Sequence, residues 1–275
     1  MEKIDLHIHT NISDGTLSPE EVVKKAKEIN CQKISITDHD IANSYEELER
    51  KYDIEIIPGI EFNTADRNLH ILGYGMLDIN SINERMTELR LLNEKVCLKV
   101  IDLMEKAGYD ISLEKLLIYL RESNFNTEII DKRKIVKYLI YMGYANNVLD
   151  AYESLIGREQ EFYVPNYKIS PQEIIKLIKD CGGIAVLAHP STISKNPEEV
   201  INKIKELKEF GLDGIEIQNG KIDLINNDIY QKLAEELNLV KTVGSDFHDP
   251  AYDHIGVETE EKTYKEFYKR LVKKR

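Results

Sequence analysis

Two histidines, His7 and His9, are separated by one residue near the start of the chain, and this spacing is its first sign of metal chemistry. The segment around them, residues 4–9, has the apolar character of a buried strand. Side chains along a strand alternate between its two faces, so both imidazoles lie on the same face. That geometry can chelate a metal ion. The alternative for this pair is a role as satisfied histidines of the core.

Six of the seven histidines lie at or just beyond the ends of predicted strands, and acidic residues accompany them. Imidazole and carboxylate groups without thiolates are typical ligands of Zn, Mn or Fe. One ion takes about four to six ligands, so the set implies two or three divalent ions. Capped loops and buried hydrogen bonds are the alternative. The nine candidate ligands are His7, His9, Asp14, His39, Glu61, His70, His189, Asp246 and His248.

Short apolar runs alternate with helical patterns in the first third of the chain and again after residue 164. Strands are predicted at residues 4–9, 33–37, 54–62, 69–74, 184–189, 214–218 and 240–246. Helices are predicted between them, and residues 261–274 form a closing helix. This rhythm indicates an α/β fold with parallel strands and outer helices. Seven strands suggest a barrel of the (β/α) type, whose sites gather at the carboxyl ends of the strands.

Between residues 81 and 163 the alternation stops and only helical periodicity remains. One face of a long predicted helix, which ends at Gly108, carries the apolar residues Leu89, Leu92, Val96, Val100 and Leu103. Further helices are predicted at residues 113–120, 129–141 and 148–156. We therefore expect an all-helical subdomain, residues 81–163, inserted into a discontinuous domain of residues 1–80 and 164–275.

The composition excludes several classes of protein. The chain has no apolar run of about 18 residues and no leader-like segment, so we expect a cytoplasmic protein that does not contact membranes. A net charge of −12 disfavours binding of long nucleic acid, so any nucleic-acid substrate should be short. Cys31, Cys97 and Cys181 lack CxxC spacing, which indicates free thiols.

Taken together, the motifs resemble the polymerase and histidinol phosphatase (PHP) family. The resemblance implies a distorted (β/α)7 barrel, related to the TIM barrel, and usually a trinuclear metal site. It rests on the segments His7-Ile8-His9, Asp14-Gly15, Thr37-Asp38-His39, Gly59-Ile60-Glu61, His70, Ala188-His189-Pro190 and Gly244-Ser245-Asp246-Phe247-His248.

The resemblance also implies how the nine ligands are divided among three ions. Glu61 would bridge two of the ions. The first ion would be held by His7, His9, Glu61 and Asp246, the second by Glu61, His70 and His189, and the third by Asp14, His39 and His248.

The helical insertion, with Gly157-Arg158 and Gly182-Gly183 after it, is similar to one branch of this family. That branch hydrolyses nucleoside monophosphates and 3′,5′-bisphosphates, and some members trim short RNA from the 5′ end. Its members usually present Arg-Pro-His in the insertion, where this chain has Lys132-Arg133-Lys134. Arg158, Lys132 and Arg133 are candidate phosphate contacts, because cationic side chains bind phosphate oxygens. The alternative is a solvated helix face.

The expected reaction is metal-dependent hydrolysis of a phosphate monoester, carried by AMP, a nucleoside 3′,5′-bisphosphate or a short 5′-phosphorylated oligoribonucleotide. A metal-bridging hydroxide held by Glu61 would attack phosphorus, because coordination lowers the pKa of water toward about 7. His189 and His248 are candidate proton donors to the leaving group. Two alternatives stay open: a histidinol-phosphate phosphatase with the same ligands, and a non-catalytic metal-binding regulatory module.

Overall fold

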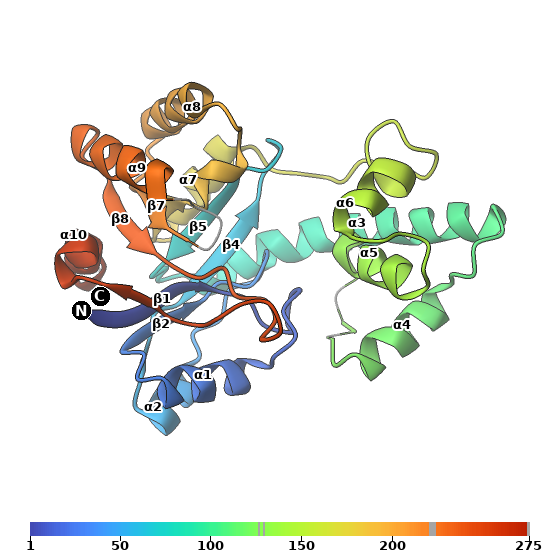
Figure 1. The fold of residues 1–275 in the computed structure, drawn as a ribbon, viewed down its shortest axis with the longest axis horizontal. Helices are drawn as coiled ribbons and strands as arrows, with labels where there is room; N and C mark the ends of the chain where they lie inside the picture. Colours follow the sequence, from blue (N-terminus) through green and yellow to red (C-terminus); the bar gives the residue numbers. More distant parts are fainter. Residues whose placement is uncertain (126, 129, 220–223, 274–275) are drawn as a thin grey trace.

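The protein consists of a part built on two β-sheets and a helical part at the opposite end of the molecule (Figure 1). This is a computed structural model, and it describes residues 1–125, 127–128, 130–219 and 224–273. The α/β class predicted from the sequence is confirmed, since strands and helices alternate through most of the sheet part.

A four-stranded sheet of order β3-β2-β1-β9 carries the N-terminal histidines. The pairs β1·β2 and β2·β3 are parallel, whereas β9 runs antiparallel to β1. The sequence does not predict β9, which has only 3 residues. The strands are β1 (Glu2–Ile8), β2 (Lys33–Ile36), β3 (Glu55–Ile56) and β9 (Val257–Thr259).

A five-stranded sheet of order β4-β5-β6-β7-β8 carries the remaining strands. The pairs β4·β5 and β5·β6 are antiparallel, and β6, β7 and β8 are parallel. β5 and β6 are hydrogen-bonded neighbours although the whole helical insertion lies between them in the chain. The strands are β4 (Gly59–Asn63), β5 (His70–Tyr74), β6 (Ile184–Leu187), β7 (Gly214–Gln218) and β8 (Val240–Val243).

The expectation of a closed seven-stranded barrel is not confirmed, because the described strands form two separate mixed sheets. The predicted strand at residues 54–62 is in fact β3 and β4, which lie in different sheets. Pro58 separates them, since proline has no N–H to donate to a strand ladder. Single bridges, Ile8 with Phe247 and His39 with Glu61, still bring the edges of the two sheets together.

Helices cover the outer faces of the sheets (Figure 1). α1 and α7 begin in the same way: a serine N-cap, Ser18 or Ser170, precedes a proline and forms a capping box with a glutamate. These caps fix where each helix begins after the loop that leads into it. The helices of this part are α1 (Pro19–Glu28), α2 (Glu46–Tyr52), α7 (Pro171–Asp180), α8 (Pro197–Glu209), α9 (Leu224–Glu236) and α10 (Glu261–Val272).

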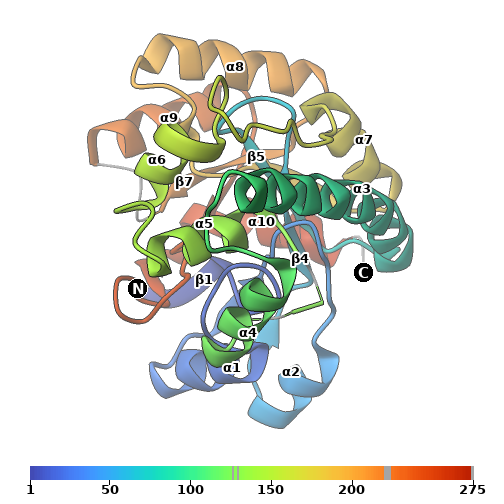
Figure 2. The ribbon, with the colours of Figure 1, turned by 90° about the vertical axis from the view of Figure 1, so that its right-hand side faces the viewer.

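The helical insertion contains α3 (Ile79–Lys106), α4 (Leu113–Glu122), α5 (Lys132–Tyr141), α6 (Val148–Ala151) and a π-helical turn, Tyr152–Ile156. The helix predicted from residue 129 begins at Lys132, because Asp131 caps it by accepting from the Lys134 N–H at 2.9 Å. Residue 129 itself lies outside the described residues. Figure 2 views the molecule from the insertion side, with the insertion helices in front of the sheets.

Three hydrophobic clusters hold these elements together. The first packs helices against the five-stranded sheet, the second lies within the insertion, and the third lies under α1. α3 belongs to two of them: Ile82 and Met86 join the first cluster, whereas Val100 and Met104 join the second. One continuous helix therefore crosses residue 81, the predicted start of the insertion, and connects the two parts.

Within the described residues, no helix has both the length and the apolar character that crossing a membrane requires. The longest, α3, has 28 residues and carries many charged side chains. Cys31, Cys97 and Cys181 are buried and free, as the sequence predicts.

Candidate metal centre

His7 at the end of β1 and His9 just after it lie on one face, as their spacing predicts. Their Nε2 atoms are 3.2 Å apart, and both side chains are completely buried. The end of β8 approaches very closely here, because a Cβ on Gly244 would lie 2.3 Å from the Cβ of His7. Glycine at this position therefore lets the two strands bring their polar side chains together.

Glu61 on β4 lies at the centre of the histidines. Its Oε2 is 3.1 Å from His9 Nε2, 3.4 Å from His7 Nε2 and 3.2 Å from His39 Nδ1. Its carboxylate is almost fully buried. One carboxylate oxygen thus faces three imidazoles that come from the loops and strand ends of the four-stranded sheet.

The second oxygen of Glu61 faces the other side of the cluster. Its Oε1 lies 2.9 Å from His70 Nδ1 and 2.9 Å from His189 Nε2. His70 begins β5, and His189 follows β6 with a left-handed φ of 24°. Glu61 therefore stands between two groups of imidazoles, the position that a bridging carboxylate requires.

Asp246 follows β8 and points its Oδ1 to within 3.2 Å of His9 Nε2 and 3.4 Å of His7 Nε2. Its backbone is left-handed, with φ of 58°, a conformation that aspartate adopts more readily than most residues. The Asp246 N–H donates to the His7 carbonyl at 2.9 Å. This hydrogen bond helps to hold the left-handed backbone of Asp246. In this conformation the Asp246 carboxylate points into the cluster.

Asp5 on β1 holds the segment that carries Asp246 in place. Its carboxylate accepts from the Ser245 N–H at 2.9 Å, the Ser245 hydroxyl at 2.6 Å and the Gly256 N–H at 2.8 Å. Burial raises the pKa of Asp5 to about 6 despite these hydrogen bonds. Sequence reasoning did not single out Asp5, although an aspartate inside an apolar strand signals a buried hydrogen-bonding role.

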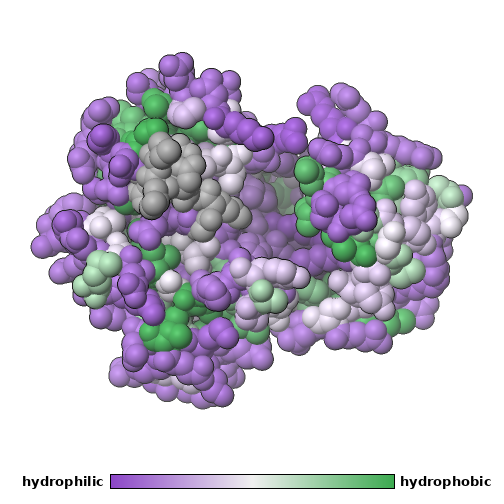
Figure 3. Space-filling view, viewed as in Figure 1, coloured by the Kyte–Doolittle hydropathy of each residue, from purple (hydrophilic) through white to green (hydrophobic). Residues whose placement is uncertain are grey.

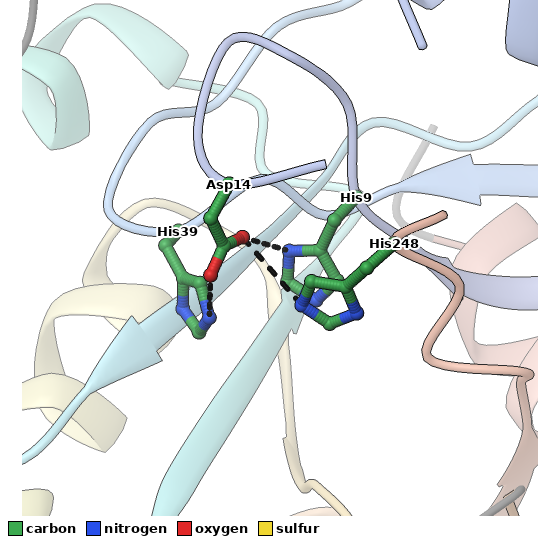
Figure 4. Close-up of side chains that lie close together, drawn as sticks. All are labelled: His9, Asp14, His39 and His248. Atoms are coloured by element: carbon green, nitrogen blue, oxygen red, sulfur yellow. Dashed lines mark ion pairs between the residues drawn. The ribbon is translucent and has the colours of Figure 1, made fainter. Parts of the chain in front are cut away.

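A group of four side chains gathers around Asp14 (Figure 4). Asp14 Oδ1 is 3.6 Å from His9 Nδ1 and 3.5 Å from His248 Nε2, and its Oδ2 is 3.8 Å from His39 Nε2. Figure 4 shows the three imidazoles arranged around the Asp14 carboxylate. These residues come from three distant segments of the chain.

The described residues contain three groups of side chains whose ligand atoms lie within 4.8 Å of one another. His9 and His39 each belong to two groups, and His189 contacts Glu61 without joining any of them. The structure thus brings all nine sequence-predicted ligands into one cluster. The groups are His7, His9, Glu61 and Asp246; His39, Glu61 and His70; and His9, Asp14, His39 and His248.

The residues present fit a metal centre by their chemistry. His9 Nδ1 is buried and has no hydrogen-bond partner, although buried polar atoms in proteins are nearly always paired. Carboxylate and imidazole atoms converge on it without any thiolate, the donor set of Zn, Mn and Fe sites. A divalent ion among these atoms would satisfy the orphaned nitrogen.

The pKa values of the cluster show how strongly its charges interact. Burial opposes protonation of His7, yet the carboxylates of Glu216, Glu61 and Asp246 hold its pKa well above the usual range. In the same way, Asp246 and Glu61 outweigh burial and raise the pKa of His9 to about 9. Without metal, the buried carboxylates therefore favour protonation of these two imidazoles.

Glu216 on β7 contacts the cluster, and sequence reasoning missed it. Its completely buried carboxylate lies 3.1 Å from His7 Nδ1 and accepts from the His189 N–H at 2.8 Å and the Asn219 amide at 3.0 Å. An acidic partner on Nδ1 leaves Nε2 of His7 facing the other ligands. The signal was present, since a glutamate between Ile215 and Ile217 in a buried strand must have a partner.

Asp38 supports the loop that carries Asp14. Its carboxylate accepts from the Thr10 N–H at 2.8 Å, the Thr10 hydroxyl at 2.7 Å and the Ser13 hydroxyl at 2.7 Å. Asp38 thus orients the loop between β1 and α1 rather than facing the cluster itself.

Among the three cations proposed to contact phosphate, the structure brings Arg133 to the cluster. Its Nε lies 3.4 Å from Asp14 Oδ2. The Lys132 ammonium instead donates to the Val164 carbonyl and lies 5.4 Å from the centre of the Tyr163 ring. Arg158 is exposed and makes no hydrogen bond or ion pair with the described residues. Substrate contact by these side chains stays a prediction.

The PHP domain family model matches residues 5–273 of this chain. A 5′-3′ exoribonuclease of Haemophilus influenzae is 29% identical over 258 residues, which are 90% of this chain and 91% of that protein. A 3′,5′-nucleoside bisphosphate phosphatase of Chromobacterium violaceum is 25% identical over 264 residues, 91% of this chain and 88% of that protein.

Solved structures share the fold. An amidohydrolase of Chromobacterium violaceum, with bound sulfate and no metal, has a TM-score of 0.82 at 23% identity, covering 97% of this chain and 96% of that one. A structure from Bifidobacterium adolescentis has a TM-score of 0.80 at 23% identity, covering 97% and 95%. With the family match spanning nearly the whole chain, the protein belongs to the PHP domain family.

Proposed function

We propose that this protein is a metal-dependent phosphoesterase that hydrolyses phosphate monoesters of nucleotides, or of short 5′-phosphorylated oligoribonucleotides. The observation that carries the proposal is the position of Glu61, whose two oxygens face histidines on opposite sides within 3.4 Å. A carboxylate placed between two groups of imidazoles suits adjacent divalent ions.

The relatives support the class of substrate. The similar proteins of known name include a 5′-3′ exoribonuclease and a 3′,5′-nucleoside bisphosphate phosphatase, both of which match along most of their length. Both names describe phosphate esters of nucleotides. The net charge of −12 is consistent with a small or short substrate rather than long nucleic acid.

We propose two or three ions of Mn, Zn or Fe, held by the nine clustered residues. Bound divalent ions would neutralise phosphoryl oxygens and lower the pKa of water. Glu61 would keep the ligand groups on its two sides at a fixed separation. Glu216 would hold His7 in the tautomer that presents Nε2 to the cluster.

The leaving oxygen needs a proton, for which we propose His248 or His189, in a state in which that histidine does not itself hold an ion. His248 Nδ1 lies 2.7 Å from the Asp246 carbonyl and donates to it, so Nε2 is the nitrogen that faces Asp14, at 3.5 Å from its Oδ1. Its side chain is 29% exposed, whereas that of His189 is 4% exposed and lies against Glu61. Exposure favours His248 as the donor that a substrate can reach.

We propose that the substrate enters the hollow between the sheet part and the insertion. Figure 3 shows this hollow, lined mostly by hydrophilic residues. A cavity of about 420 Å³ lies between Asn11 of the sheet part and residues of the insertion, and its lining consists of Asn11, Arg121, Asn124, Phe125, Thr127 and Glu128. Arg133 reaches the cluster from the insertion side and is the cation best placed to contact phosphate.

A panel of substrates tests this function. Phosphate release with Mn²⁺ present should be compared for AMP, adenosine 3′,5′-bisphosphate, short 5′-phosphorylated RNA and histidinol phosphate. We expect a nucleotide or RNA substrate to be preferred, with no release after chelation. A strong preference for histidinol phosphate would replace the proposed substrate class. Metal binding without hydrolysis of any of the four would favour the regulatory alternative.

A further inference from the structure

Arg133 is a largely buried cation that contacts Asp14 of the group drawn in Figure 4. Its Nη2 lies 3.1 Å from Asp131 Oδ2, and its Nε lies 3.4 Å from Asp14 Oδ2. Only 27% of its side chain is exposed. One guanidinium thus ties the first turn of α5 to a carboxylate that could also bind a metal ion.

Asp14 receives a second cation from the same helix. The Lys137 ammonium donates to the Asp14 carbonyl at 2.5 Å, one turn further along α5. Asp14 is the only carboxylate in the group of His9, Asp14, His39 and His248. A divalent ion in that group would therefore lie beside two positive side chains while relying on one negative ligand.

The same group also shares its histidines. His9 presents Nε2 to Glu61 at 3.1 Å and Nδ1 to Asp14 at 3.6 Å. His39 presents Nδ1 to Glu61 at 3.2 Å and Nε2 to Asp14 at 3.8 Å. The Glu61 contacts are the shorter ones for both imidazoles. The group around Glu61 and Asp246 has two carboxylates.

We propose that Arg133 competes with a divalent ion for the Asp14 carboxylate, so that this position of the cluster fills only at a higher metal concentration than the positions around Glu61. The inference rests on the proposed metal centre. It gives the insertion a role in setting how many ions the cluster holds. When the ion binds, the guanidinium keeps its contact with Asp131 and releases Asp14.

Metal binding, not turnover, is the direct test. Metal-free protein is dialysed against a series of free Mn²⁺ concentrations, and bound metal per chain is measured by mass spectrometry. Wild-type protein should fill in two stages. In Arg133→Gln the second stage should move to a lower Mn²⁺ concentration by about tenfold or more, in the range by which residues around metal ligands alter affinity. The first stage should not move.

Two controls isolate the charge at this position. Arg133→Lys keeps a cation and should leave the second stage closer to that of wild type than Arg133→Gln does. Arg158→Gln removes one positive charge from an exposed part of the insertion and should shift neither stage. Arg133→Ala repeats the main test with a side chain too short to reach Asp14, should Arg133→Gln fold poorly. Circular dichroism confirms folding of each variant.

The outcomes separate the two proposals. If wild-type protein binds two or more ions but neither Arg133→Gln nor Arg133→Ala changes the second stage, the competition is disproved and the metal centre stands. Weaker binding in the second stage of these variants would likewise overturn it. If wild-type protein binds no Mn²⁺, Zn²⁺ or Fe²⁺, the proposed metal centre itself fails.

Discussion

The metal-ligand cluster of the sheet part and the cations of α5 both place charged side chains in partly or fully buried positions, but they are built differently. In the cluster, acidic and imidazole groups come from many strand ends and face one another, with Glu61 and Asp246 each close to several histidines. The cations of α5 come from a single helix. Lys132 donates to the Val164 carbonyl, Arg133 contacts the Asp14 carboxylate, and Lys137 donates to the Asp14 backbone carbonyl.

The difference indicates which side chains are held rigidly and which can be changed with less effect on their neighbours. The cluster's side chains are held by two sheets and by buried hydrogen bonds that the carboxylates of Asp5 and Glu216 accept, so a change there disturbs several contacts at once. The insertion's cations depend on how one helix lies against the sheets. We therefore expect changes in the cluster to abolish metal-dependent activity, and changes on the insertion to adjust affinity.

The largest effect is expected for Glu61→Gln. The substitution removes the negative charge between the two groups of ligands. We expect this to cost several kcal/mol of transition-state stabilisation, which corresponds to a loss of roughly 10³-fold or more in kcat. Bound metal per chain should also fall. Steady-state kinetics and metal analysis measure both. Glu258→Gln, on the exposed side of β9, is the matched control. Turnover near the wild-type rate in Glu61→Gln would contradict a central role.

Glu216→Gln should have the next largest effect, because it removes the charge that orients His7. Loss of such a partner typically costs about 10- to 100-fold in metal affinity. Titration with Mn²⁺ should show weaker binding, while saturating Mn²⁺ should restore most of the turnover. The restoration distinguishes a positioning residue from Glu61. If saturating metal restored nothing, Glu216 would act in some other way.

The pH dependence of stability should differ between the metal-free and metal-loaded protein. The pKa of His9 is raised from its ordinary value of 6.5 to about 9, so its protonation stabilises the folded state below pH 6.5. This stabilisation is lost as the pH rises toward about 9. Metal ions need neutral imidazoles, so stabilisation by metal should instead increase with pH.

Thermal unfolding with EDTA, compared with Mn²⁺, across this pH range measures the two slopes. We expect the melting temperature of the metal-free protein to fall with rising pH and the increment from Mn²⁺ to grow. His254→Gln, which changes an exposed histidine outside the cluster, should keep both slopes. A metal-free melting temperature that rose through this range would contradict the charge balance proposed for the cluster.

The smallest effect is expected for Arg158→Ala. An exposed ionic contact is worth about 0.2–1 kcal/mol, which corresponds to a rise in KM of about 1.4- to fivefold with kcat unchanged. Kinetics with AMP and with short 5′-phosphorylated RNA measure it. An unchanged KM for both would remove Arg158 from the substrate site, and a large loss of kcat would show that the insertion takes part in chemistry.

The sequence predicts that the nine candidate ligands lie close together, because side chains at strand ends follow a simple rule. Strands alternate their faces, as at His7 and His9, and strand ends gather on one side of the sheet. Most helices could also be predicted, since Ser18 and Ser170 begin recognisable capping boxes. Local pattern was sufficient for these elements.

Other features depend on contacts between distant segments and could not be read in this way. β4 and β5 are antiparallel strands of a second sheet because they pair with each other, and strand pairing cannot be predicted from local pattern. Only Pro58 indicated that the apolar run at residues 54–62 forms two strands. The contact of Arg133 with Asp14 depends on how the insertion docks. Nothing in the residues around Arg133 identifies that partner.

The continuity of α3 has a consequence for the geometry of the whole protein. Ile82 and Met86 anchor its start in the sheet part, and Val100 and Met104 anchor its end in the insertion. An α-helix advances about 1.5 Å and turns about 100° with each residue. Removing a single residue between these anchors would therefore shorten the link slightly but swing α5 far around the helix axis. The length of α3, counted in residues, sets which face of the insertion meets the cluster.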